Sequence, residues 1–141
     1  MQKDLTKITA FIKKHHVMSL ATTEGTKPSV CSLFYVYDES MLSFVVASSE
    51  DTLHIKNIIQ NSAVAGNIFL ETQEVGKIEG LQFDGVMTLL NESSVKKLYF
   101  KRFPYALAMM PKLWKIEVKK FKLTDNNLGF GKKIIYSCAS L

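Results

Sequence analysis

The sequence predicts a mainly β protein with added helices, in which six or seven antiparallel strands form a small barrel and three helices lie between them. Short apolar runs, many of alternating polarity, are separated by turn residues at short intervals, as in small barrels. Only three longer stretches have the spacing of an amphipathic helix. Gly80 and Gly85 interrupt the apolar run at residues 78–90, and glycines inside a strand mark the bends or bulges at which small barrels turn corners.

The composition describes one globular unit. At 141 residues the chain is long enough for one hydrophobic core and short for two, so we expect a single domain spanning residues 1–141. No apolar run reaches the length of about 18 residues that a membrane helix needs. The N-terminus lacks the apolar segment of a signal peptide. We therefore expect a cytoplasmic protein with no membrane partner.

Cysteine and histidine are few. Cys31 and Cys138 lie far apart in predicted strands and form no CxxC pair, so reduced, structural thiols are expected. The three histidines, His15, His16 and His54, do not have the spacing of a zinc site, and no metal is expected.

Basic residues gather in the last third of the chain. From Lys96 onward there are 11 of the 18 Lys and Arg residues but only two acids, Glu117 and Asp125, whereas residues 1–95 hold 7 basic and 11 acidic residues. This split suggests an anionic partner or two regions that attract each other. Nucleic-acid binding is the weaker alternative, because the lysines alternate with core residues and are not interleaved with stacking aromatics.

The N-terminal part predicts a helix and three strands. Residues 4–14 carry one apolar stripe and end in a Lys-Lys pair, which suits a helix C-terminus. Strands are expected at residues 17–22, 29–37 and 41–47. The middle one is apolar on both faces, so one face is expected on the core and the other under a helix, a ligand or a second subunit. We therefore expect a symmetric homodimer.

The strand at residues 41–47 leads into five polar residues, 48–52, which we call the polar knot. Helical spacing of Ile55, Ile58 and Ile59 follows the knot, and another strand begins at Ala63. Ser48 or Ser49 is expected to cap the helix, with Asp51 in its first turn.

A helix N-terminus beside hydroxyl groups is a candidate phosphate site, because its unpaired N–H groups and its dipole favour an anion. The candidate ligands are Ser48, Ser49, Thr52, His54 and Lys56. In the alternative interpretation the serines only cap the helix, Glu50 and Asp51 repel anions, and the histidine faces solvent.

The C-terminal half predicts more strands and a third helix. Strands are expected at residues 63–70 and 78–90, and Asn91 is expected to cap a helix that runs to Phe103 with Val95, Leu98 and Tyr99 inward. Residues 105–110 suggest a short helical turn. The strand from Leu113 changes phase between Val118 and Phe121, which predicts a bulge at Lys119 and Lys120. A Gly-rich loop at residues 128–131 precedes the last strand, residues 132–138.

Four segments carry a resemblance to a known family: VVASSEDTLHIKNIIQNSAVA, IEGLQFDG, the helix end RFP and the tail LTDNNLGFGKKIIY. Together they resemble the split-barrel FMN-binding proteins related to pyridoxamine-phosphate oxidase, and most of all the small uncharacterised YhbP-like proteins. The resemblance covers essentially the whole chain. It implies a split β-barrel and a homodimer with two FMN sites across the subunit interface, the flavin phosphate lying at the polar knot.

Matched residue by residue, the family's phosphate motif places Ser48 and Thr52 at its hydroxyl positions, Leu53 at its Arg position and His54 at its Lys position. Leucine cannot supply the guanidinium, and one charge-assisted contact is worth about 1.5–3 kcal/mol, so weak or absent FMN binding is expected. The flavin ring is expected along residues 32–35, with Trp114 reaching it from the partner or, more simply, lying in the core.

The family's basic run before the last strand corresponds to residues 129–133, where only the last basic position is kept. Oxidation of pyridoxamine phosphate is therefore not expected. Lys132 and Lys133 can approach a flavin held mainly by the other subunit, or they are solvated charges that protect a strand edge from aggregation.

The resemblance implies a flavin-dependent oxidoreductase or flavin reductase, in which the cofactor carries out the redox chemistry and the chain positions it. The alternative is a non-enzymatic dimeric split-barrel binding protein that has lost tight flavin binding and holds another small anionic ligand. Haem binding, a further alternative, would need His54, His15 or His16 as ligand.

Overall fold

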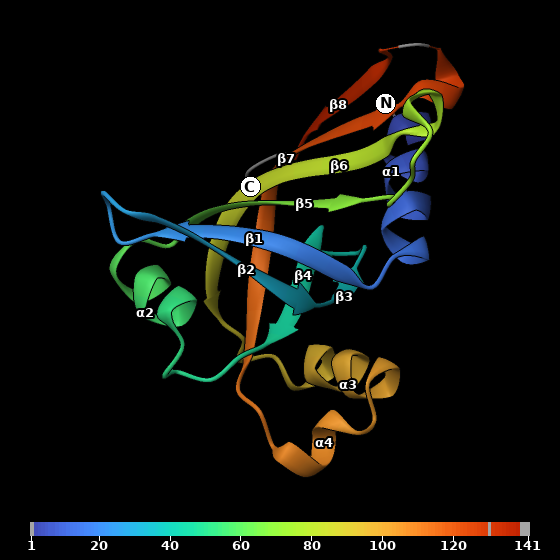
Figure 1. The fold of residues 1–141 in the computed structure, drawn as a ribbon. Coiled ribbons are helices and arrows are strands. Elements are labelled where there is room, and N and C mark those ends of the chain that lie inside the picture. The colour runs from blue at the N-terminus through green and yellow to red at the C-terminus, as the bar shows by residue number, and fades with distance from the viewer. Residues whose placement is uncertain (1, 130, 139–141) are drawn as a thin grey trace.

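The computed structural model describes residues 2–129 and 131–138, which form a bent sheet of eight antiparallel strands with helices around it (Figure 1). The helices are α1 (Gln2–Lys14), α2 (Leu53–Gln60), α3 (Ser93–Arg102) and the short α4 (Ala106–Met109). The strands are β1 (Val17–Thr23), β2 (Pro28–Phe34), β3 (Val36–Asp38), β4 (Ser43–Ala47), β5 (Ala63–Phe69), β6 (Glu79–Leu89), β7 (Leu113–Asp125) and β8 (Lys133–Ser137). Two 3₁₀ turns, η1 (Val75–Lys77) and η2 (Asn126–Leu128), pack near each other.

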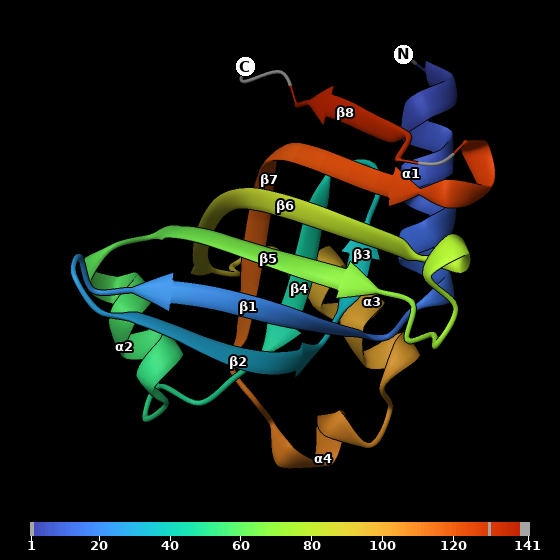
Figure 2. The ribbon, with the colours of Figure 1, turned by 45° about the horizontal axis from the view of Figure 1, so that its top comes forward.

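The sheet has the strand order β2-β1-β5-β6-β7-β4-β3, and β8 pairs with β7 outside this path. The strands curve into a half-barrel, with α1 and α2 on opposite sides of it and α3 and α4 together at one end (Figures 1 and 2). The predicted split barrel with three helices is confirmed, with α4 as the predicted short helical turn. In the described part of the chain, no helix is long and apolar enough to cross a membrane.

One predicted strand, at residues 29–37, is two strands in the structure. The break lies at Tyr35, whose N–H donates to the carbonyl of His16 (3.1 Å) and whose hydroxyl donates to the carbonyl of Ile12 (2.5 Å). The ring is fully buried. Tyr35 is thus tied to the end of α1 and to the residue before β1. Pairing with β1 ends at Phe34, opposite Val17, and β3 pairs with β4 instead.

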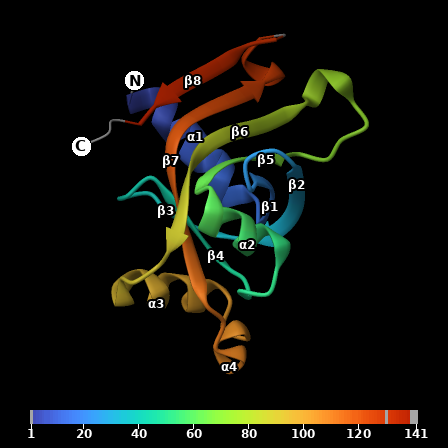
Figure 3. The ribbon, with the colours of Figure 1, turned by 90° about the vertical axis from the view of Figure 1, so that its left-hand side faces the viewer.

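The longest strand, β7, holds the barrel together (Figure 3). It pairs with β6 along most of its length, with β4 in its first half and with β8 in its second half. Asp84 pairs with Lys120 but Gly85 pairs with Val118, so Lys119 is the extra residue of a β-bulge. This confirms the bulge that the change of phase predicted.

The core has two parts that meet at β4. Phe44 and Val46 face a large cluster shared with α1, α2 and the inner faces of most strands, whereas Val45 faces a smaller cluster under α3. Tyr99 is buried in the smaller cluster, and Val95 and Leu98 pack against it, as predicted.

Three details of the helix starts differ from the predictions. Thr52, rather than Ser48 or Ser49, is the N-cap of α2, because its Oγ1 accepts from the N–H of Ile55 (3.4 Å). Asp51 consequently lies before the helix and not in its first turn. The residue before α3 is Glu92, so Asn91 is not the cap; the Glu92 carboxylate instead accepts from Lys115 (3.1 Å) and from the N–H of Asn91.

The buried face of α2 also differs from the prediction. Ile59 is 67% exposed, and the buried residues are Ile55, Asn57 and Ile58. Asn57 is buried because its Nδ2 donates to the Thr22 hydroxyl (3.1 Å) on β1. This hydrogen bond fixes how α2 lies on the barrel.

Candidate functional site

The polar knot connects the end of β4 to the start of α2, and its first residue is held firmly. The N–H of Ser48 donates to the carbonyl of Lys112 (3.1 Å), and its carbonyl accepts from the indole Nε1 of Trp114 (2.9 Å). Trp114 is 5% exposed and belongs to the large core cluster, in line with the simpler of its two predicted placements. The core therefore fixes the backbone of Ser48.

Three polar side-chain atoms of this region converge. The Nε2 atom of His54 lies 2.5 Å from the Oγ of Ser48 and 3.3 Å from the Oγ1 of Thr52, and the two hydroxyl oxygens are 3.5 Å apart. We call these three residues the hydroxyl–imidazole cluster. The first N–H groups of a helix have no partner within the helix, so the cluster lies where α2 favours an anion.

His54 is neutral more readily than an ordinary histidine. Its pKa is lowered because partial burial disfavours the charged imidazolium. A neutral imidazole can accept a hydrogen bond from a hydroxyl, and a protonated one can donate to a phosphate. The cluster can therefore hold itself together without a ligand and can donate to an anion after taking up a proton.

The other two predicted ligands have different positions. Ser49 shapes the turn, since its Oγ accepts from the N–H of Asp51 (3.3 Å) and its carbonyl accepts from the Thr52 hydroxyl (2.8 Å). Lys56 is exposed on α2, two residues beyond His54. Glu50, which the alternative interpretation expected to repel anions, forms an ion pair with Lys112.

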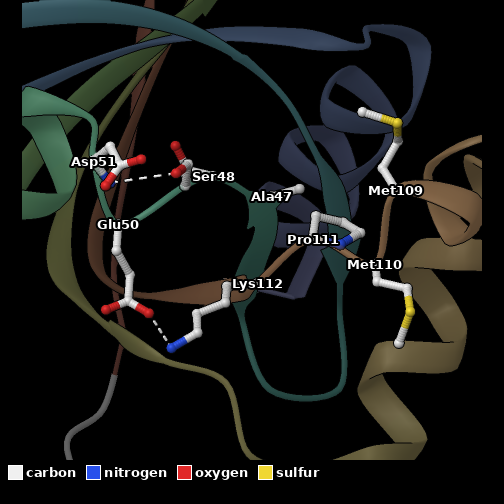
Figure 4. Close-up of a pocket in the computed structure, with 9 residues that line it drawn as sticks. Ala47, Ser48, Glu50, Asp51, Met109, Met110, Pro111 and Lys112 are labelled. Carbon is white, nitrogen blue, oxygen red and sulfur yellow. Dashed lines mark hydrogen bonds and ion pairs between the residues drawn. The ribbon is translucent and has the colours of Figure 1, made fainter.

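Beside the polar knot is an open hollow of about 680 Å³ (Figure 4). The polar knot from Ser48 to Asp51 forms one wall, and Met109, Met110, Pro111 and Lys112 form another. The two methionine side chains are 81% and 85% exposed. Ser48 belongs both to this hollow and to the hydroxyl–imidazole cluster, so the two features adjoin.

The sequence analysis did not identify Met109, Met110 or Lys112 as part of the site. They come near the polar knot because β7 pairs with β4, with Leu113 opposite Ala47. The sequence hinted at their role only through residues 105–110, an apolar segment between two prolines that directly precedes Lys112 and a strand.

The structure does not bring Lys132 and Lys133 to the polar knot within one chain. Both are exposed at the start of β8, and β8 lies well away from α2 in every view (Figures 1–3). Their predicted approach to a flavin from a second subunit stays a prediction. Phe130, in the same predicted run, lies outside the described residues.

The strand expected beside the flavin ring is only partly open. Ser32 and Phe34 are exposed on β2, but the Tyr35 side chain is fully buried, so within this stretch only the exposed residues offer side chains to a ligand. The expected place of the flavin ring stays a prediction. The rings of Phe34 and Phe103 form a T-shaped pair, with their centroids 5.7 Å apart.

The other histidines lie at the far end of β1 from α2. His15 packs on the ring of Phe11, with ring centroids 4.4 Å apart, and His16 is exposed. Within residues 2–129 and 131–138, no three His, Cys, Asp or Glu side chains are grouped so that they would hold a metal. Cys31 and Cys138 are free thiols, and burial raises the pKa of both.

Comparison with solved structures shows which proteins share this fold. A putative pyridoxamine 5'-phosphate oxidase from Listeria innocua matches with a TM-score of 0.70 and 17% identity, over 84% of this chain and 96% of that one. HutZ, the heme storage protein from Vibrio cholerae, matches with a TM-score of 0.68 and 17% identity, over 80% of this chain and 88% of that one. At these identities the likeness is one of fold, and the chain has the split β-barrel fold of these proteins.

Among proteins of this fold, the chain belongs to the UPF0306 family. It is 31% identical over 137 residues to a UPF0306 protein of Yersinia pestis, and the match covers 95% of this chain and 93% of the relative. No protein-family model matches the chain. The family name carries no activity, so a function has to be argued from the site.

Proposed function

We propose that this protein binds FMN and acts as a flavin-dependent oxidoreductase or flavin reductase, with the flavin phosphate at the polar knot. The observation that supports it most directly is the hydroxyl–imidazole cluster, in which Ser48, Thr52 and His54 converge at the start of α2. The resemblance to split-barrel FMN proteins points to the same residues.

The residues present fit a phosphoryl group, but with few charges. The Ser48 hydroxyl and helix N–H groups can donate to phosphate oxygens, and His54 donates once protonated. The Thr52 hydroxyl could join them by giving up its hydrogen bond to the Ser49 carbonyl (2.8 Å). The charge of Lys112 is already offset by Glu50. Leu53, at the family's Arg position, is 60% exposed and apolar, so it gives the phosphate no hydrogen bond. Modest affinity is therefore part of the proposal.

Bound FMN would supply the hydride or electron transfer, and the chain's own residues bind and orient it. Met109 and Met110 give the hollow an apolar wall against which a ring system can pack. Lys132 and Lys133 would come from the partner of a homodimer, since they are remote from the polar knot in their own chain. The free thiols suit a reducing, cytoplasmic compartment.

Titration with FMN tests this proposal, and Trp114 provides the signal. It is the only tryptophan in the chain, and its indole donates to Ser48. FMN bound at the polar knot should quench Trp114 fluorescence with a dissociation constant below about 100 μM. His54→Arg should tighten binding by about tenfold, because it restores a permanent charge, and Ser48→Ala and Lys133→Ala should weaken it.

A matched control is Ser93→Ala, which removes an exposed hydroxyl from the start of another helix, α3. It should leave FMN affinity unchanged. The flavin proposal is contradicted if the protein is colourless as purified and if 100 μM FMN does not quench its Trp114 fluorescence. Saturable binding of inorganic phosphate in that same protein would favour the alternative, a non-enzymatic split-barrel protein for another anionic ligand.

A further inference from the structure

A second hollow, of about 680 Å³, lies between the β3–β4 turn, the outer face of β4 and β7, and the start of α3. We call it the α3 groove. None of the residues that line it belongs to the polar knot or to the hollow beside it. Its volume lies within the range of small-molecule sites.

The floor of the α3 groove is apolar. Val45 and Leu90 are buried members of the smaller core cluster, and Val95 packs against them from α3. Val45 and Leu90 are closed to solvent, so the apolar surface that a ligand can reach comes from Val95 and from Met41, which is 64% exposed. An apolar group placed there would cover both side chains. Burial of apolar surface is the main favourable contribution to such binding.

The mouth of the groove is held in a strained conformation. Leu42 has a φ of 50°, in the left-handed region that a bulky side chain rarely adopts, and its carbonyl accepts from the N–H of Val118 (3.1 Å). Strain of this kind persists only where surrounding structure fixes it, and it is common at ligand sites. The mouth therefore has a defined shape in the free protein.

The rim of the α3 groove is acidic although the whole chain has a net charge of +5. Three carboxylates line it, those of Asp38, Glu92 and Glu117, against one ammonium, that of Lys115. The Nζ of Lys115 already forms an ion pair with the Oε1 of Glu92 (3.1 Å). Lys119, outside the groove, approaches Glu117 at 3.1 Å, but both side chains are exposed, so the pairing is weak. Among the residues that the structure describes, the Oδ1 atom of Asp38 accepts from neutral donors, the N–H and hydroxyl of Ser40.

The sheet places two of these carboxylates on one row. Asp38 pairs with Ser43 across β3 and β4, and Ser43 pairs with Glu117 across β4 and β7. With strands about 4.8 Å apart, the two acidic positions are roughly 10 Å from each other on either side of Ser43. A small cation between them would be attracted by both.

We propose that the α3 groove binds a small molecule with an apolar body and one protonated primary amine. The apolar body rests on Met41 and Val95, and the amine lies between Asp38 and Glu117. The charge of the rim selects the cation, and the floor selects the apolar body. This site is independent of the proposed flavin site.

The test is a pair of probes with one body and opposite charge, 4-phenylbutylamine and 4-phenylbutyrate, titrated by calorimetry at low salt. The amine should bind with a dissociation constant of about 1 mM or tighter, and the carboxylate at least tenfold more weakly. The double variant Asp38→Asn, Glu117→Gln should weaken amine binding by about tenfold. Glu39→Gln, which removes a neighbouring carboxylate outside the groove, should not.

A second pair of variants tests the position. Ser94 lines the groove and is exposed, whereas the adjacent Ser93 is exposed outside it. Ser94→Trp should abolish amine binding, and Ser93→Trp should leave it intact. Equal affinity for the two probes, no amine binding at 10 mM, or binding that survives Ser94→Trp would each overturn the inference. So would dissociation of a dimer by Ser94→Trp, which would make the groove a subunit contact.

Discussion

The proposed phosphate site depends most on His54, because this side chain is charged only when it is protonated. Burial lowers its pKa, and Ser48 and Thr52 are its hydrogen-bond partners in the free protein. An incoming phosphate would favour the imidazolium that burial disfavours. Anion binding at the polar knot should therefore be coupled to proton uptake.

The lowered pKa also predicts how stability depends on pH. The unfolded chain protonates this imidazole near 6.5, and the folded chain only at a lower pH. Between those two values the unfolded state binds more protons, so stability falls as the pH drops below about 6.5 and is unaffected by His54 above it. His54→Gln keeps a hydrogen-bonding group and removes the titration. It should lose less free energy of unfolding between pH 7.5 and 5 than the native chain in urea denaturation.

His15 contributes in the same direction, since burial lowers its pKa too, so some pH dependence should remain in the His54→Gln variant. An identical pH dependence in the variant and the native chain would mean that His54 is as solvated in the folded protein as in the unfolded one.

The residues of the cluster were predictable because they are close in sequence. Ser48, Thr52 and His54 lie within seven positions, and the approach of a strand to a helix brings them together by local geometry alone. The methionines of the hollow and Lys112 lie about sixty residues further on. Their placement depends on the register of β7 against β4, which no local pattern specifies.

At the scale of single elements, α2 carries the site and one buried hydrogen bond positions it. Thr22 on β1 is 3% exposed and Asn57 on α2 is 6% exposed, and the Asn57 amide donates to the Thr22 hydroxyl (3.1 Å). A buried polar group that loses its partner costs more than the bond itself contributes.

Thr22→Val is nearly the same shape and leaves the Asn57 amide without its partner, so it should lower the free energy of unfolding by about 1–3 kcal/mol. Asn57→Leu should also lower the free energy of unfolding. The double variant should lose less free energy of unfolding than the two single variants lose together. Denaturation followed by Trp114 fluorescence measures all three. Strict additivity would show that the two side chains do not interact.

The bulge between β6 and β7 makes a second prediction about an element. A Cβ on Gly85 would lie 2.2 Å from the carbonyl oxygen of Glu117, a backbone atom that cannot move away cheaply. Gly85→Ala should therefore destabilise the protein by about 3 kcal/mol. Gly80→Ala, in the same strand, meets nothing closer than 3.8 Å and should change stability by less than about 1 kcal/mol. Equal thermal midpoints for the two variants would contradict this account of the bulge.

The elements also show where sequence reasoning succeeded and where it failed. A change of phase along residues 113–123 was enough to predict the bulge, because a period-two pattern cannot shift by one residue otherwise. The break at Tyr35 gave no such signal, since its neighbours on both sides are apolar. It arises from long-range hydrogen bonds to Ile12 and His16.

At the scale of the whole molecule, the outer face of β1 and β2 presents exposed apolar side chains. Val17 pairs with Phe34 across these strands, and Val30 pairs with Ala21, so their exposed side chains share one face. The rest of that face carries small residues such as Ser19, Ala21 and Ser32. An apolar face edged by small side chains suits a flat, self-complementary contact, and the proposed homodimer would use it.

Val30→Asp tests this, because Val30 is 71% exposed in one chain, and a charge there should not disturb the fold. If the proposed dimer uses this face, two copies of the aspartate would be buried near the symmetry axis, and the variant should elute as a monomer in size-exclusion chromatography with light scattering. Val75→Asp is the matched control, since Val75 is 75% exposed in the η1 turn, away from the face. It should keep the native mass. A Val30→Asp variant that stays dimeric would place the subunit contact on another face. A native chain that is already monomeric would leave Lys133 no route to a flavin at the polar knot.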